Sequence, residues 1–349
     1  MNKKLQNINI KEIKTILTPE TLKANAPLSQ ANATFIYESR ETVKAILNQT
    51  DKRKLIITGP CSIHDTKAAL DYAKKLKACQ EKANVKDKVF LMMRVYFEKP
   101  RTTIGWKGLI NDPDINQTYT IEKGLSIARD LLLQITELGV PIASEILDPI
   151  TPQYLSDLIS WGSIGARTTE SQIHREMASG LSMPIGFKNT TNGQPDLAIN
   201  AMKAAQHEHS FIGTNKEGQI SIVQTTGNPW THLILRGGDS GPNYDPTSIN
   251  DAIAKLKEAN LNPNIIVDCS HGNSRKKHEN QPIVFNNVLS QIQNGNDHIM
   301  GMMLESNLEA GNQPMQTDQS KLEYGVSITD SCIDWKTTEE LILNCLEKS

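Results

Sequence analysis

The chain has 349 residues, with 37 basic and 39 acidic side chains and a formal net charge of −2. This balance lacks the basic excess that dominates nucleic-acid affinity, so we do not expect a nucleic-acid partner. No run of about 18 apolar residues follows the basic N-terminus or occurs elsewhere, so the sequence predicts neither an export signal nor a membrane span. We therefore expect a cytoplasmic protein whose five cysteines are reduced thiols.

From about residue 55 onward, short β-rich apolar segments alternate with longer amphipathic segments such as 66–82 and 121–138. Eight such units predict an α/β fold, a (β/α)8 TIM barrel whose catalytic groups lie at the C-terminal ends of the strands. An open doubly wound sheet is the alternative, although no glycine-rich dinucleotide-binding motif follows the first strand. The expected strands are 55–58, 89–96, 142–146, 164–167, 185–188, 233–236, 265–268 and 300–304.

Two segments do not fit the eightfold alternation. Residues 1–50 precede the first strand and contain a predicted helix at 31–48. Residues 210–226 form two β-rich segments around a polar NKEG turn, which predicts an inserted hairpin. We therefore expect an N-terminal extension followed by one catalytic barrel that spans 51–349 and includes the hairpin.

Charged or ligating side chains end nearly every predicted strand, and in a barrel such groups point into one shared mouth. One set consists of cations, several of them beside glycines, suited to binding phosphate and carboxylate groups. The set indicates a polyanionic substrate. Its members are Arg94, Arg101, Arg167, Lys188 and Arg236.

A second set offers one thiolate, one imidazole and two carboxylates, a mixed donor set that fits a divalent transition metal better than Mg²⁺ or Ca²⁺. Its members are Cys61, His271, Glu305 and Asp330. They lie on four separate segments without CxxC or HExxH spacing, so they meet only if the barrel prediction is correct. Each has an ordinary alternative, as a core cysteine, a loop histidine or a solvated carboxylate.

The chain contains the motifs GPCSIHD, MRVYFEKPRTTIGWKGLINDPD, SWGSIGARTTESQIHREMASGLSMPIGFKN, ILRGG, DCSHGNS, ESNLEAGNQ and YGVSITDSCIDW. With them the sequence resembles the metal-dependent 3-deoxy-D-arabino-heptulosonate 7-phosphate (DAHP) synthases of the branch found in enteric bacteria and fungi. The resemblance implies a (β/α)8 transferase that joins phosphoenolpyruvate to erythrose 4-phosphate, the entry step to chorismate and the aromatic amino acids. The sister 3-deoxy-octulosonate 8-phosphate synthases, which differ at the KPRT segment, are the nearer alternative. A phosphate-binding sensor barrel without catalysis is the remote one.

The resemblance also implies roles for individual residues. It places one divalent metal ion (Mn, Fe, Co or Zn) on Cys61, His271, Glu305 and Asp330. It places phosphoenolpyruvate on Arg94, Arg167, Lys188 and Arg236, with an ordered water on Glu145. Erythrose 4-phosphate is expected on Lys99, Pro100, Arg101, Thr102 and Asp330. The expected catalytic residues are Lys99, Glu145, Lys188, Cys61 and His271, with Lys99 as the proton donor to the alkoxide. In a rival, metal-free mechanism, Lys188 forms a Schiff base.

Two loops depart from the family pattern. The usual GFKNGTDG is GFKNTTNG here, so Thr190 replaces glycine and Asn192 replaces aspartate. The usual RGG-Lys-x-PNY is RGGDSGPNY, one residue longer, with Asp239 in place of lysine and Ser240 and Gly241 after it. Neither change removes a residue with an implied role.

The extension and the hairpin are where the family keeps subunit contacts and feedback inhibition. The resemblance therefore implies a homo-oligomer, a dimer or tetramer, inhibited by an aromatic amino acid. Gly213 resembles the tyrosine-sensitive isozymes, because phenylalanine-sensitive ones tend to have serine there, so tyrosine is favoured over phenylalanine. The implied effector residues are Pro152, Gln153, Ser182, Phe211 and Gly213, and the alternative is that they only pack the hairpin.

Overall fold

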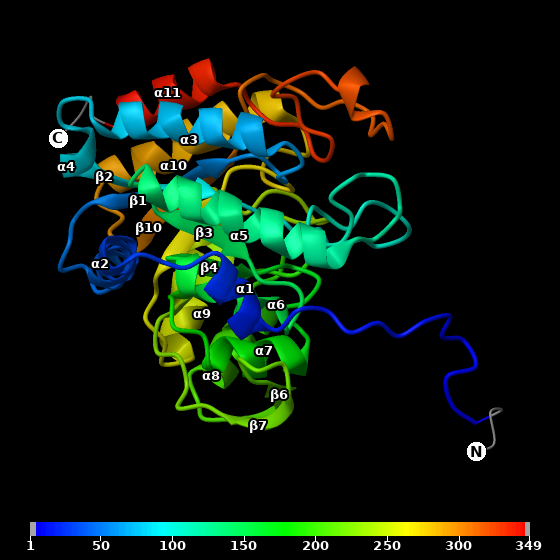
Figure 1. Cartoon of the computed structure of the whole chain (residues 1–349). Helices are drawn as coiled ribbons and strands as arrows, with labels where there is room; N and C mark the ends of the chain where they lie inside the picture. The colour runs from blue at the N-terminus through cyan, green and yellow to red at the C-terminus, as the bar shows by residue number, and fades with distance from the viewer. Residues whose placement is uncertain (1–4, 346–349) are drawn as a thin grey trace.

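Eight parallel strands close into a barrel in the computed structural model, which describes residues 5–345 (Figure 1). Around the barrel the hydrogen-bonded order is β1-β10-β9-β8-β5-β4-β3-β2, and the predicted (β/α)8 fold is confirmed. The strands are β1 (Lys54–Gly59), β2 (Val89–Arg94), β3 (Ile142–Glu145), β4 (Trp161–Ile164), β5 (Ile185–Lys188), β8 (Thr231–Leu235), β9 (Ile265–Asp268) and β10 (Ile299–Glu305).

Helices follow the strands and surround the barrel (Figure 1). Asp65 caps the N-terminus of α3, where its side chain accepts hydrogen bonds from the backbone amides of Lys67 and Ala68. Along α3, apolar residues at three- and four-residue steps are buried against the sheet. The helices are α3 (Thr66–Gln80), α4 (Val85–Lys88), α5 (Ile121–Glu137), α6 (Thr151–Leu155), α7 (Gln172–Ser179), α8 (Asp196–Ala205), α9 (Pro246–Glu258), α10 (Gln281–Gln293) and α11 (Trp335–Asn344).

The fourth strand was placed three residues too late by the sequence. It runs over Trp161–Ile164, whereas the prediction was 164–167. The chain leaves the sheet at Gly165, whose carbonyl accepts the amides of Thr168 and Thr169 and so begins a turn. The short segment WGSI holds only two large apolar residues, so its strand character depends on Trp161 filling the barrel interior. Arg167 therefore lies in the loop after the strand.

The N-terminal segment contributes two helices, α1 (Pro19–Asn25) and α2 (Gln30–Leu47). The buried face of α2 packs Val43, Ile46 and Leu47 into the apolar cluster inside the barrel. Asn264, directly before β9, donates a hydrogen bond of 2.8 Å to the Leu47 carbonyl, which places this contact at the N-terminal end of the strands. Because α2 covers that end, the opposite, C-terminal end remains as the mouth of the barrel.

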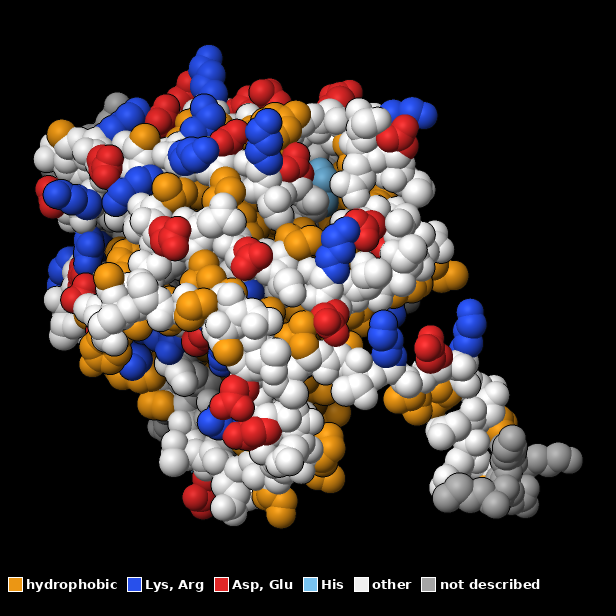
Figure 2. All heavy atoms as spheres, viewed as in Figure 1, with side chains coloured by type: hydrophobic (Ala, Val, Ile, Leu, Met, Phe, Trp, Pro, Cys, Tyr) orange, Lys and Arg blue, Asp and Glu red, His pale blue; other side chains and the backbone are white. Residues whose placement is uncertain are grey.

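The predicted hairpin is present as β6 (Ser210–Thr214) and β7 (Ile220–Gln224), paired antiparallel. Figure 1 shows it at the bottom of the view beside α7 and α8, while the chain before α1 runs away from the barrel. In Figure 2, acidic and basic side chains alternate over the visible face instead of gathering in one basic patch. Among residues 5–345, no helix is long and apolar enough to cross a membrane.

Candidate active site

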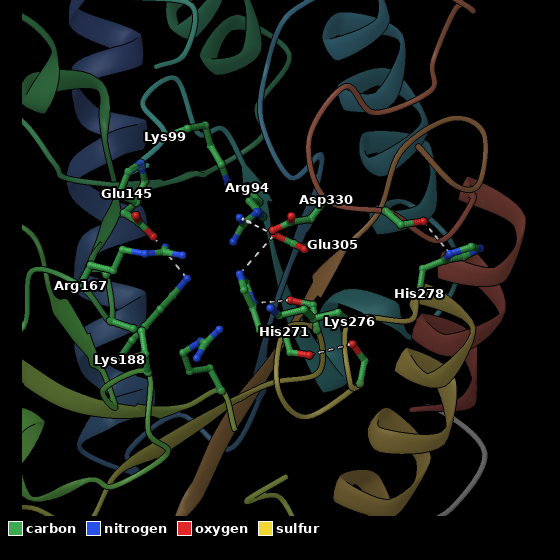
Figure 3. Close-up of a pocket in the computed structure, with 18 of the residues that line it drawn as sticks. Arg94, Lys99, Glu145, Arg167, Lys188, His271, Lys276, His278, Glu305 and Asp330 are labelled. Carbon is green, nitrogen blue, oxygen red and sulfur yellow. Dashed lines mark hydrogen bonds and ion pairs between the residues drawn. The ribbon is translucent and has the colours of Figure 1, made fainter. Parts of the chain in front are cut away.

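A cavity of about 370 Å³ opens at the C-terminal end of the barrel. Figure 3 shows its side chains converging on one space, with Arg167 and Lys188 on the left of the view and Glu305 and Asp330 near its centre. The predicted residues that line it are Arg94, Lys99, Pro100, Arg101, Glu145, Arg167, Lys188, Arg236, His271, Glu305 and Asp330. Cys61 and Thr102 are not part of this lining, but they contact Lys99 and Arg167 respectively.

Arg94, at the end of β2, is one of the largest fully buried side chains of the protein. Its guanidinium donates to Glu305 Oε1 at 2.8 Å and to the carbonyls of Pro60 and Cys61 at 3.1 and 3.2 Å. Burial alone would lower the pKa of Arg94, but its surroundings, which include the Glu305 carboxylate, raise it above its ordinary value. This ion pair joins β2 to β10 at the floor of the cavity.

Lys188, at the end of β5, is likewise buried and faces two carboxylates. Its ammonium lies 3.3 Å from Glu145 Oε2 and 3.7 Å from Asp268 Oδ2. Burial alone would lower the pKa of Lys188, yet these negative neighbours contribute to a pKa above the ordinary value. Burial also opposes ionisation of Glu145, but Lys188 and Lys99 hold the pKa of that carboxyl below its usual range. Both members of the pair are therefore charged.

Three arginines of the cavity, Arg101, Arg167 and Arg236, have no carboxylate within ion-pair distance in the described part of the chain. Arg167 donates from Nε to Thr102 Oγ1 at 3.0 Å, and Arg236 donates from Nη1 to the Gly237 carbonyl at 3.2 Å. Arg101, on the exposed segment after β2, uses Nε to bind the Trp106 carbonyl at 2.7 Å. These guanidinium groups keep most of their donors available for an anionic ligand.

Three of the four predicted metal ligands meet. One ligand atom each from Cys61, Glu305 and Asp330 lies within 4.8 Å of the others. His271 is outside this group, although its Nε2 lies 3.7 Å from Glu305 Oε1. A thiol and two carboxylates beside an imidazole form a donor set that suits a divalent transition metal.

The orientation of His271 is set from behind. Its Nδ1 lies 3.0 Å from Asp268 Oδ2 and 2.7 Å from Ser270 Oγ, which leaves Nε2 directed toward Glu305. Metal-binding histidines commonly use their second nitrogen in this way. His271 has a left-handed backbone (φ 54°), held by a hydrogen bond from the Lys276 amide to its carbonyl. The arrangement fits a metal ligand.

Lys99 contacts Cys61 at the cavity. Its ammonium is 3.2 Å from both the Sγ and the carbonyl oxygen of Cys61. Burial opposes the charge of Lys99, but Cys61 and Glu305 contribute to a raised pKa. Burial, followed by the Glu305 carboxylate, raises the pKa of the Cys61 thiol to about 11. A bound cation would deprotonate such a thiol on coordination.

Sequence reasoning missed several residues of the site. Asp268 is the most consequential, because its buried carboxylate contacts both Lys188 and His271. Its position at the end of β9, three residues before His271, was the available signal. Lys276 and His278 also line the cavity, together with Thr191, Asp239, Ser270, Ser274, Asn312 and Ser331.

The two loops with unusual sequences contact each other. Thr190 Oγ1 donates to Asn192 Oδ1 at 2.6 Å, and Ser240 Oγ donates to the Asn192 carbonyl at 2.5 Å. The Asp239 amide donates to the Thr191 carbonyl at 2.8 Å, which places the Asp239 side chain at the cavity. The substitutions and the longer loop therefore act together as one rim of the mouth.

The predicted effector residues lie on three segments, and none of them lines the cavity. Pro152 and Gln153 belong to α6, Ser182 follows α7, and Phe211 and Gly213 lie on β6. A Cβ atom at Gly213 would come within 2.7 Å of Val223 Cγ2 on the paired strand. A larger residue there would therefore displace a side chain of the hairpin.

Glu98 precedes Lys99 and is buried. Burial, followed by the Asp148 carboxylate, raises its pKa to about 8, against a hydrogen bond of 3.1 Å from Thr151 Oγ1. Because this pKa is higher in the folded state than in the unfolded state, ionisation of the Glu98 carboxyl favours the unfolded state. We expect the free energy of unfolding to fall from about pH 4.5 upward and to level off above about pH 8, on the order of 2–4 kcal/mol in total.

Glu98→Gln should remove this contribution. We expect its melting temperature to match the parent near about pH 5 and to exceed it at about pH 9, measured by calorimetry. Glu38→Gln, at an exposed position of α2, is the matched control and should follow the parent at both pH values. If the difference in melting temperature between the parent and Glu98→Gln does not change with pH, this interpretation is wrong.

The fold and the cavity together define a class of protein: a (β/α)8 barrel with a cation-rich site at the C-terminal ends of its strands, where enzymes of this fold carry out catalysis. Comparisons with known proteins are more specific. The model of the DAHP synthetase I family matches residues 26–342. The chain is 52% identical over 338 residues to the Tyr-sensitive phospho-2-dehydro-3-deoxyheptonate aldolase of Escherichia coli (strain K12), covering 97% of this chain and 94% of that protein.

The Trp-sensitive enzyme of the same bacterium is 49% identical over 330 residues, covering 95% of this chain and 94% of its own length. A solved structure of the phospho-2-dehydro-3-deoxyheptonate aldolase from Francisella tularensis SCHU S4 superposes with a TM-score of 0.94 at 48% identity, covering 97% and 98% of the two chains. The chain belongs to the DAHP synthetase I family, as its sequence motifs predicted.

Proposed function

We propose that this protein condenses phosphoenolpyruvate, erythrose 4-phosphate and water to DAHP and inorganic phosphate, the first step of the shikimate pathway. The observation that carries the proposal is the cavity itself, in which guanidinium groups without a carboxylate partner among residues 5–345 lie beside a thiol–carboxylate–imidazole group. The names of the relatives describe the same aldol chemistry.

Binding is the first task of the cations, because two phosphorylated anions repel each other in one cleft. Arg167, Lys188 and Arg236 would hold phosphoenolpyruvate, with Arg94 at the floor. The segment of Lys99, Pro100, Arg101 and Thr102 would receive erythrose 4-phosphate. The bond between Arg167 and Thr102 joins the two subsites and supports a fixed spacing between the substrates.

Cys61, His271, Glu305 and Asp330 would hold one divalent metal ion, of which Mn, Fe, Co and Zn all suit the donors. When bound, such an ion acts as a Lewis acid toward a carbonyl oxygen. The reduced thiol that this site requires supports a cytoplasmic location.

The chain's own residues would then move the protons. Lys99 is charged and close to Cys61, so it can donate a proton to the alkoxide formed when C3 of phosphoenolpyruvate attacks the aldehyde. Glu145 is ionised beside Lys188, so it can orient the water that adds at C2 before phosphate departs by C–O cleavage.

The environment of Lys188 argues against the Schiff-base alternative. A lysine that attacks a carbonyl must lose its proton, which buried lysines achieve by a lowered pKa. Here Glu145 and Asp268 hold the ammonium in its charged form. The lysine therefore suits anion binding.

The proposal is tested by assaying the purified protein, with each divalent metal in turn, on phosphoenolpyruvate with erythrose 4-phosphate or arabinose 5-phosphate. We expect DAHP to form from phosphoenolpyruvate and erythrose 4-phosphate, and no turnover of arabinose 5-phosphate. Turnover of arabinose 5-phosphate would assign the octulosonate reaction instead. Binding of both phosphates without turnover under any metal would favour the sensor barrel.

We also propose that the extension and the hairpin serve assembly and regulation in a homo-oligomer. Ile212, Ile220 and Ile222 expose between 76 and 80% of their surface on the hairpin, and Leu5 and Ile13 expose 78 and 77% ahead of α1. Apolar side chains are visible at both places in Figure 2. Such groups exposed together are typical of a protein interface.

Replacement of two hairpin isoleucines tests this assembly. Ile212→Asp/Ile222→Asp should shift the protein to a smaller species in analytical ultracentrifugation, because charges replace apolar contacts at the interface. Ile173→Asp, an exposed isoleucine on α7, is the control that should keep the parent's mass. A parent that sediments as a monomer contradicts the assembly proposal directly.

Among aromatic amino acids we propose tyrosine as the effector, supported by Gly213 and by the Tyr-sensitive relatives. In the structure, hydrogen bonds connect both α6 and the hairpin turn to the N-terminal segment. The Tyr154 hydroxyl of α6 donates to the Leu17 carbonyl at 2.8 Å, and Glu20 of α1 bonds Lys216 in the hairpin turn. Calorimetric titration with tyrosine, phenylalanine and tryptophan should show binding of tyrosine, and the absence of tyrosine binding removes it as effector.

A further inference from the structure

Three asparagines lie behind one wall of the cavity without lining it. Asn189 directly follows β5, Asn243 lies in the loop after β8, and Asn273 lies in the loop after β9. Asn189 and Asn273 are buried, and Asn243 is half-buried. Each of the three loops carries residues that do line the cavity, so the amides connect the backbone that supports the site.

Asn243 is the centre of this network. Its Oδ1 accepts the Gly237 amide at 2.7 Å, and its Nδ2 donates to Asn189 Oδ1 at 3.2 Å and to the Gly193 carbonyl at 3.1 Å. Its own backbone amide donates to Asn273 Oδ1 at 2.8 Å. Because Gly237 and Asn243 offer obligate backbone donors, they settle which ends of the Asn243 and Asn273 amides are oxygen.

The backbone of Arg236 is held on both sides by the other two asparagines. Its backbone amide donates to Asn189 Oδ1 at 2.7 Å, and its carbonyl accepts a hydrogen bond from the backbone amide of Asn273 at 3.1 Å. Among the residues that the structure describes, the guanidinium itself has one hydrogen bond, to the adjacent Gly237 carbonyl. The position of the guanidinium in the cavity therefore depends on where this backbone lies.

The loops approach so closely that glycine is required where they touch. A Cβ atom at Gly238 would lie 2.1 Å from the Gly193 nitrogen, and one at Gly272 would lie 2.4 Å from the Gly238 nitrogen. Gly237, with φ +67°, would place a Cβ atom 2.5 Å from the Asn273 nitrogen. Such backbone packing transmits a shift of one loop to its neighbours.

We propose that Asn243 is a positioning residue for phosphoenolpyruvate: through Gly237, Asn189 and Asn273 it fixes the place of Arg236, although it does not touch the substrate. This inference rests on the proposed function. Erythrose 4-phosphate is expected on the segment after β2, which the network does not contact. Loss of the Asn243 amide should therefore affect the two substrates unequally.

The test is steady-state kinetics of Asn243→Ala at saturating metal. We expect KM for phosphoenolpyruvate to rise at least about tenfold, while KM for erythrose 4-phosphate stays within about twofold of the parent. Asn264→Ala is the control, because Asn264 is a buried asparagine whose side chain bonds the Leu47 carbonyl at the opposite end of the barrel. It should leave both KM values within about twofold of the parent.

A merely structural role for Asn243 predicts a lower melting temperature and a smaller active fraction with both KM values unchanged, and that result overturns the proposal. If Asn243→Ala does not fold, Asn243→Asp replaces it, because the aspartate keeps the acceptor for Gly237 and loses the donors to Asn189 and Gly193. An unchanged KM for phosphoenolpyruvate in that variant also overturns it.

Calorimetric titration of phosphoenolpyruvate alone keeps the two hypotheses separate. If the parent binds phosphoenolpyruvate but does not condense it with erythrose 4-phosphate, the proposed function fails. The inference about Asn243 is then judged by the dissociation constant, which should rise by the same factor of about ten or more in the variant.

Discussion

Cys61→Ala should lose the bound metal and nearly all activity. The thiol is the one sulfur ligand of the candidate site, and its loss leaves Glu305 and Asp330 with a weaker set of donors. A Lewis-acid metal lowers the activation barrier by several kcal/mol. Because the variant loses this stabilisation, we expect kcat to fall by about 10³-fold or more. Metal content of the purified variant, measured by elemental analysis, should fall well below the parent's value.

The matched control is Cys345→Ala, which removes a thiol that caps α11 outside the cavity. It should retain both metal and activity. Exhaustive chelation of the parent should reproduce the effect of Cys61→Ala, and added divalent metal should restore the parent but not the variant. Full activity in chelated protein, with borohydride trapping of substrate on Lys188, contradicts the metal hypothesis.

Arg94→Leu should cost both stability and catalysis. The substitution leaves the Glu305 carboxylate buried without the partner that now lies at 2.8 Å, and breaking a buried ion pair from one side costs about 3–5 kcal/mol. The same change removes a cation from the floor of the cavity, so kcat/KM should fall by about 10³-fold or more. Stability is measured by denaturant unfolding after chelation, because a bound metal would partly compensate Glu305.

Arg129→Leu separates the two effects. Arg129 is as buried as Arg94 and pairs with Asp157 at 2.9 Å, and neither residue lines the cavity. It should lose stability, while kcat/KM per folded molecule stays within about twofold of the parent. If Arg94→Leu behaves like this control, Arg94 serves the fold alone.

The repeated β and α patterns predicted the closed barrel because each pattern arises from local periodicity, and the strand ends then located the catalytic mouth. The failure at β4 has a local cause as well. WGSI is too short and too poor in apolar residues to be recognised without the barrel interior that Trp161 fills. Likewise, the apolar face of α2 was visible in the sequence, but nothing local shows that it covers the bottom of the barrel.

The same limit applies to the site. The sequence by itself determined which residue types stand at the strand ends, and with them the cation set, the candidate metal ligands and the family. Only the tertiary structure decided the partners: Glu305 with Arg94, and Asp268 with both Lys188 and His271. Ion-pair and hydrogen-bond energies depend on distances of a few ångströms between residues far apart in the chain, and such distances exist only once the barrel has closed.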